Sequence, residues 1–122
     1  AGPGLLPPVI DIEYGGNCSA RPPKDELLKE IGEFSDMVER KYGSRPLIYT
    51  TNQSYRDFIA GALPGYMIWI RDIYSSPRLA DGREWSFWQY TNRGRLWGID
   101  GFVDLNVYNG TREEFKTLLS RN

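Results

Sequence analysis

Two carboxylates one residue apart are the best candidates in this sequence for catalytic chemistry. Asp11 and Glu13 alternate with Ile10 and Ile12 in a short β-branched run, which is typical of a strand. Residues i and i+2 of a strand point to the same face, so we expect the two carboxylates about 7 Å apart on one side. Like charges at that range cannot both ionise freely, so one pKa should rise. The pattern predicts one acid and one carboxylate at neutral pH.

Such a pair suits glycosidic bond cleavage, in which an acid protonates the leaving oxygen and a carboxylate stabilises positive charge. Two other interpretations stay open at this point: solvated carboxylates at a strand end, and ligands of a metal ion. Asp104 and Asn106, with Asp100 nearby, repeat the i, i+2 spacing. Taken alone, capping of a turn is the favoured role for that second group.

Aromatic residues accompany the predicted strands. The chain has four Trp and eight Tyr, and such rings stack on sugars, although burial in a core is the commoner role of any single ring. Tyr49, Trp69, Trp88 and Tyr90 lie in or near strands. Side chains alternate along Trp88-Gln89-Tyr90, so Gln89 faces away from its two neighbours and is available to a ligand if they face a core.

The composition excludes several classes of site. No histidine is present, which rules out Ser-His-Asp and Cys-His hydrolysis and His-based zinc sites. A single cysteine cannot form an internal disulfide, and no phosphate-binding or dinucleotide glycine motif occurs. The net charge of −1 gives no reason to expect nucleic acid or an anionic membrane as partner. We expect no cofactor, no metal and no membrane span. Scattered arginines are interpreted as a solvated face: Arg71, Arg78, Arg83, Arg93 and Arg95.

The elements that must position these residues alternate along one small domain. Strands are predicted at 9–14, 46–50, 66–71 and 85–90, and helices at 22–42, 54–59 and 111–119. Residues 92–94 are predicted as a turn, and 99–109 as a loop with a short extended piece. Strands that alternate with helices and are apolar on both faces favour βα units around a parallel sheet.

Two of the helices have clear sequence signals. The first should bury a stripe and end at Gly43, a residue suited to a C-terminal cap. The last should open with a capping box, in which Thr111 and Glu114 bond to each other's backbone. The residues of the predicted stripe are Leu27, Ile31, Phe34 and Val38.

Five ordered runs together resemble glycoside hydrolase family 25, the Chalaropsis-type lysozymes: residues 9–13, 47–50, 68–70, 88–90 and 103–106. The resemblance implies an irregular β/α barrel that hydrolyses the β-1,4 bond between N-acetylmuramic acid and N-acetylglucosamine. It implies that Glu13 is the general acid and that Asp11 orients the substrate's acetamido group. Asp104 resembles a further acidic residue of the groove. Sugar-contacting residues of the groove would be Tyr49, Trp69, Gln89 and Tyr90.

The chain departs from that family in length. Members run to nearly twice 122 residues and begin with a strand that carries another active-site Asp. We therefore expect residues 1–122 to form a single partial catalytic domain: a partial barrel of about four mostly parallel strands with flanking helices, without the N-terminal strands of an eight-strand barrel. An open sheet exposes its edges, which favours self-association or cover by a missing N-terminal half. Glycan strands of peptidoglycan are the expected partner, in an extracellular, periplasmic or phage lytic setting.

Two other functions stay open. A peptidoglycan- or chitin-binding module would keep the groove without turnover. A chitinase-like enzyme of family 18 also uses an Asp-x-Glu strand, but the longer Asp-x-x-Asp-x-Asp-x-Glu run of that family is missing here.

Overall fold

The centre of the computed structural model is a five-stranded sheet with the strand order β1-β2-β3-β4-β5. The structure describes residues 6–13, 23–98, 100–101 and 103–120. Strands β1 to β4 are parallel, and β5 is antiparallel to β4. The expected α/β class is confirmed, whereas the partial barrel remains an expectation. The strands are β1 Val9–Ile12, β2 Leu47–Thr51, β3 Ile68–Arg71, β4 Phe87–Gly94 and β5 Val103–Tyr108.

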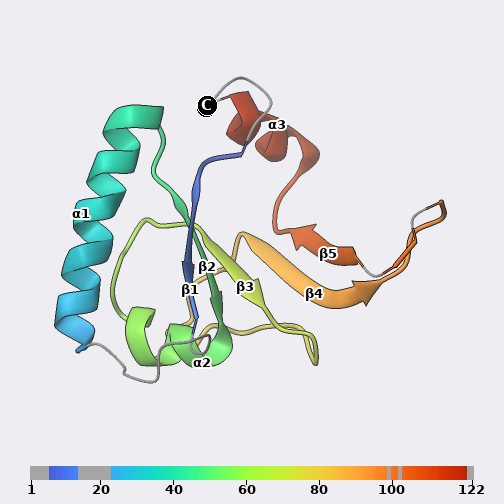
Figure 1. The fold of residues 1–122 in the computed structure, drawn as a ribbon, viewed down its shortest axis with the longest axis horizontal. Helices are drawn as coiled ribbons and strands as arrows, with labels where there is room; N and C mark the ends of the chain where they lie inside the picture. Colours follow the sequence, from blue (N-terminus) through green and yellow to red (C-terminus); the bar gives the residue numbers. More distant parts are fainter. Residues whose placement is uncertain (1–5, 14–22, 99, 102, 121–122) are drawn as a thin grey trace.

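Helices flank this sheet on two sides. In Figure 1, α1 runs alongside the sheet, and α3 lies at the opposite end of the sheet from α2. Since α2 directly follows β2, it marks the end of the sheet at which the parallel strands finish. Among the described residues, no helix has the length and apolar character needed to span a membrane. The helices are α1 Lys24–Tyr42, α2 Asn52–Ser54, the π-helix η1 Tyr55–Ile59 and α3 Arg112–Ser120.

The two faces of the sheet have different characters. One face is an apolar core shared by the strands, α1 and η1, with Ile12, Ile31, Ile48, Phe58, Ile59, Ile68 and Ile70 all buried. On the other face, Leu47 and Phe87 pack against Leu118 of α3, near the start of the strands. Toward the strand ends this second face becomes polar, because Asp11, Tyr49 and Trp69 follow one another in register across β1, β2 and β3.

Both helix-end predictions are confirmed. The N–H of Gly43, at φ 80°, donates to the Glu39 carbonyl over 2.8 Å. Thr111 Oγ1 accepts from the Glu114 N–H at 3.1 Å, and Glu114 Oε1 accepts from the Thr111 N–H at 3.2 Å. These bonds satisfy backbone groups that a helix end leaves without a partner.

Several sequence predictions were wrong. Residues 92–94 continue β4 rather than turning, because antiparallel pairing with β5 extends the strand through two register shifts. The short extended piece predicted within 99–109 is the strand β5. The sheet therefore has a fifth strand. On α1, Phe34 is 52% exposed and Ser35 is buried in its place. Tyr14 and Pro22, the outer limits of two predicted elements, lie outside the described residues.

Candidate active site

The predicted acid pair lies where the first strand ends. Asp11 is in β1, and Glu13 follows the strand directly. The pKa of Glu13 is raised, first by partial loss of solvent around its carboxyl, then by a hydrogen bond to Asp11 and by the negative charge of that residue. The positive charge of Arg71 opposes this rise. The expectation that one pKa of the pair rises is confirmed, and the group concerned is Glu13.

Tyr49 and Gln89 lie on the same face of the sheet as this pair. Tyr49 pairs in register with Asp11, and its ring meets Trp69 edge to face with centroids 5.2 Å apart. The Tyr49 hydroxyl donates a hydrogen bond to Oε1 of Gln89. Gln89 is only 4% exposed, so this bond satisfies an acceptor that water does not reach easily. The structure thus brings together the acid pair and three of the predicted sugar-contacting residues.

The second acidic group approaches the site from β5. Trp69 Nε1 donates to Oδ1 of Asn106 at 2.8 Å, which joins β3 to β5 across β4. Asp104, two residues earlier in the same strand, is exposed, and its charge is one of the causes that raise the pKa of Tyr49. Asp104 and Asn106 therefore lie near the site, and the turn-capping role favoured for them does not describe strand residues. Asp100 precedes this strand and is exposed.

Tyr90 is the predicted site residue that the structure does not bring to this group. Its ring packs on Trp88 with centroids 5.8 Å apart, and Trp88 packs against the core that contains α1. Tyr90 thus lies on the side of β4 opposite to Gln89, as strand alternation requires. A sugar contact by Tyr90 remains a prediction.

The sequence profile of the family "Glycosyl hydrolases family 25" matches residues 2–99. The chain belongs to glycosyl hydrolase family 25. A solved family 25 glycosyl hydrolase from Bacillus anthracis is 42% identical, with a TM-score of 0.84 over 92% of this chain and 54% of that one.

Two curated relatives extend this comparison. YegX of Escherichia coli K12 is 38% identical over 116 residues, covering 95% of this chain and 41% of YegX. Lysozyme M1 of Streptomyces globisporus is 30% identical over 115 residues, covering 87% of this chain and 38% of that protein. The family 25 chain therefore spans about two fifths of these relatives and about half of the solved structure.

Two further residues that lie at this candidate site were not predicted from the sequence. Arg71, interpreted as part of a solvated face, acts electrostatically on both Glu13 and Tyr49. Its position two residues after Trp69, at the end of a predicted strand, puts it on the same face as Trp69 and could have indicated its place at the site. Thr50 is fully buried, and its Oγ1 donates to the Ile12 carbonyl at 2.6 Å. That bond fixes the peptide between the two carboxylates, and no local sequence pattern reports it.

Asp72 holds the loop that follows β3 at the rim of the site. Its carboxylate accepts from Asn52 Nδ2 at 2.9 Å and from the N–H groups of Tyr74 and Ser75 at 3.0 Å each. Burial alone would raise the pKa of Asp72, but these hydrogen bonds outweigh it and lower the pKa. The carbonyl of Asp72 also accepts from Trp88 Nε1 at 2.8 Å. The loop is therefore held by side chains from α2 and β4.

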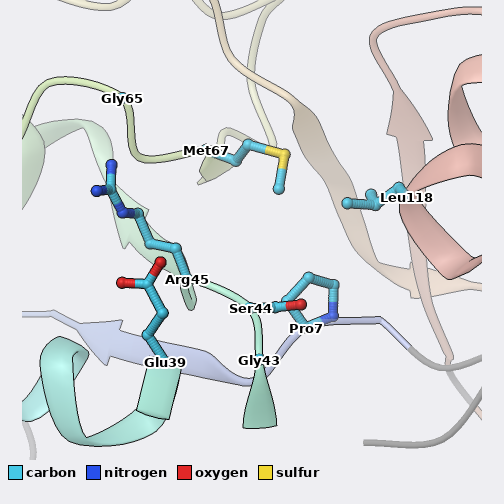
Figure 2. Close-up of a pocket in the computed structure, with 8 residues that line it drawn as sticks. All are labelled: Pro7, Glu39, Gly43, Ser44, Arg45, Gly65, Met67 and Leu118. Carbon is cyan, nitrogen blue, oxygen red and sulfur yellow. The ribbon is translucent and has the colours of Figure 1, made fainter. Parts of the chain in front are cut away.

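A hollow at the opposite end of the sheet, where the parallel strands begin, is separate from the acid pair. Its volume is about 350 Å³, and Figure 2 shows Glu39 and Arg45 on one side with Met67 and Leu118 across from them. Arg45 stacks over the Tyr66 ring at 4.7 Å. No group of three potential metal-ligating His, Cys, Asp or Glu residues occurs in the described part of the chain.

Proposed function

We propose that this family 25 chain carries the acid pair of a muramidase, which hydrolyses the β-1,4 bond between N-acetylmuramic acid and N-acetylglucosamine in peptidoglycan. The observation that carries the proposal is the placement of Asp11 and Glu13 together at the end of β1, where partial loss of solvent, then a hydrogen bond to Asp11 and the charge of Asp11, raise the pKa of Glu13. Family membership and the similarity to Lysozyme M1 support the same class of reaction.

The proposed reaction has two steps. In the first step, protonated Glu13 gives its proton to the glycosidic oxygen. At the same time the acetamido oxygen of the muramoyl unit attacks C1 of that unit, and the bond from C1 to the leaving sugar breaks. Ionised Asp11 orients the acetamido group and stabilises the positive charge that develops on it. Glu13 then takes a proton from water as that water attacks C1, which restores both the acetamido group and the acid.

The remaining residues would form the walls of the groove. Trp69 and Tyr49 offer ring faces and edges to sugar C–H groups, and the amide N–H₂ of Gln89 is a donor for a hydroxyl or acetamido oxygen. Asn106 fixes the Trp69 ring through its 2.8 Å hydrogen bond. Glycan strands of peptidoglycan are the partner in this proposal, in an extracellular, periplasmic or phage lytic setting.

The decisive experiment is the clearance of purified cell walls by the complete protein and by Glu13→Gln. Loss of a general acid costs about 100-fold or more in rate. Glu33→Gln, an exposed residue of α1, is the matched control and should retain the rate. Mass spectrometry of borohydride-reduced products should find muramic acid at the new reducing ends. Glucosamine at those ends, undiminished clearance by Glu13→Gln, or wall binding without cleavage would each refute the proposal.

A further inference from the structure

Arg71 places a positive charge on the polar face of the sheet. It is the last residue of β3 and pairs in register with Thr51 on one side and Gln89 on the other. Since it lies two residues after Trp69, its side chain leaves the strand on the site face. The residue is half-buried. Its guanidinium is therefore partly withdrawn from water beside the groove.

This cation is not held in an ion pair with the described residues. Within that part of the chain, no carboxylate oxygen lies within 4.0 Å of a guanidinium nitrogen of Arg71. The Arg71 charge nevertheless reaches Glu13 and Tyr49, where it opposes the burial that raises both pKa values. Arg71 thus faces the site while its planar fork of donors stays available to another acceptor.

An anionic substrate could bind here only if a cation offsets the negative charges around the site. Asp11, Glu13 and Asp104 place three carboxyl groups close enough to Tyr49 for their charges to act on it. A glycan that carries its own carboxylate would be repelled by them, because like charges in partly desolvated surroundings interact strongly. A guanidinium binds a carboxylate through two parallel, charge-assisted hydrogen bonds. Such a contact would both offset the repulsion and fix the orientation of the sugar.

We propose that Arg71 binds the free lactyl carboxylate of a muramoyl unit that carries no stem peptide, next to Glu13, and so selects an anionic amino sugar at that position. The inference rests on the proposed function, because it deepens the substrate class of the same site. It makes Arg71 a substrate-binding residue.

The test uses two monosaccharides that contain no bond to cleave. N-acetylmuramic acid carries the lactyl carboxylate, and N-acetylglucosamine is the same sugar without it. Titration of each into the complete protein, followed by NMR shifts of the Trp indole N–H groups, should show about tenfold tighter binding of the acid, as expected for one charge-assisted contact. Arg71→Gln should remove that preference, and Arg71→Lys should retain part of it.

The matched control is Arg112→Gln, an exposed arginine on α3, which should keep the full preference. Circular dichroism checks that each variant is folded. If the wild type binds both sugars equally, or if folded Arg71→Gln keeps the preference, the inference is overturned.

A second measurement separates this inference from the proposed function. Glycan strands stripped of peptide are compared with the same strands after carbodiimide amidation of their carboxylates. Amidation should raise the wild-type KM about tenfold. It should not raise the KM of Arg71→Gln, because that variant has no cation at this position to lose and the repulsion from the carboxyl groups falls. Preferential binding of N-acetylmuramic acid without cleavage of either strand would refute the muramidase and support Arg71. Cleavage of both strands with equal KM by the wild type would support the muramidase and overturn the role of Arg71.

Discussion

The hydroxyl of Tyr49 donates a hydrogen bond to the side-chain oxygen of Gln89, reaching from β2 across β3 to β4. This bond joins two strands that are not neighbours, on the face that carries the acid pair. Burial, followed by the negative charge of Glu13, raises the pKa of Tyr49. The phenol therefore keeps its proton at neutral pH and remains a donor. The bond also fixes which end of the amide is the acceptor, so the N–H₂ group of Gln89 can donate to a substrate.

Replacement of Tyr49 by Phe tests this bond. The Gln89 oxygen is almost fully buried, so loss of its donor should destabilise the protein by about 1–3 kcal/mol and raise KM. Thermal unfolding and steady-state kinetics measure the two effects. Tyr42→Phe, on an exposed position of α1, should change neither. An unchanged melting temperature for Tyr49→Phe would show that the bond adds nothing.

The pKa of Glu13 should move in opposite directions in two variants. Asp11→Asn removes the negative charge that raises this pKa, so the pKa should fall toward the ordinary value of 4.5. Arg71→Gln removes the charge that lowers it, so the pKa should rise further. Carbon NMR titration of the Glu13 carboxyl measures both without any need for turnover.

The same shifts should be visible in the pH profile of turnover. Glu13 must be protonated to act as the acid, so the rate falls as pH rises through its pKa. The alkaline limb should therefore move to lower pH in any residual activity of Asp11→Asn, and to higher pH in Arg71→Gln. If the alkaline limbs of Asp11→Asn and Arg71→Gln moved in the same direction, the assigned charges would be contradicted.

Asp81 should stabilise the fold in a pH-dependent way. Its carboxylate accepts from the Gly61 N–H at 2.9 Å and from the Tyr55 hydroxyl at 2.8 Å. Although burial alone would raise the pKa of Asp81, these bonds and Arg83 lower it from 3.8 to about 2. Because the folded pKa is the lower one, this stabilisation is complete above the unfolded value and is lost as pH falls toward 2.

We expect Asp81→Asn to lower the free energy of unfolding by about 1–2 kcal/mol at neutral pH. The difference from wild type should shrink as the pH approaches the folded pKa. Urea unfolding at neutral and acidic pH measures it. Asp36→Asn, exposed on α1, is the control. A deficit of the same size at both pH values would contradict a contribution from the ionised carboxylate.

Two glycines should respond to alanine with opposite signs. Gly43 has a φ of 80°, which alanine adopts only at a cost of about 1–2 kcal/mol. Gly32 lies inside α1, and an added Cβ there meets nothing within 4 Å, so alanine should stabilise the protein by about 0.5–1 kcal/mol. Thermal melts of both variants give the comparison. Equal effects would show that backbone conformation does not decide the outcome.

The parts of the fold that depend on local chemistry were predictable. The end of α1 at Gly43 and the capping box at Thr111 follow from single residues that satisfy helix termini. The extension of β4 was not predictable, because the pairing with β5 that extends it depends on a partner strand. Phe34 fits the helical stripe in sequence, yet small Ser35 is buried instead, since packing against the sheet chooses the face.

The residues of the site likewise divide into those that local sequence predicts and those that depend on contacts between distant segments. Asp11, Glu13 and Gln89 could be predicted from the alternation of side chains along a strand. Tyr49 and Trp69 were predicted as groove residues only through the resemblance to family 25. Arg71 and Thr50 act through space on residues far away in the sequence, at Glu13 and at the Ile12 carbonyl. Such relationships appear only once the register of β1, β2 and β3 is known.

The acid pair belongs to the edge of the sheet. Strand β1 has four residues and, among the described strands, pairs only with β2. Edge segments with few bonds open locally at a lower free energy than that of global unfolding. For residues 1–122 taken by themselves, we therefore expect this one strand to fray before the domain melts. Amide hydrogens of β1 would then exchange earlier on heating than those of β2 and β3.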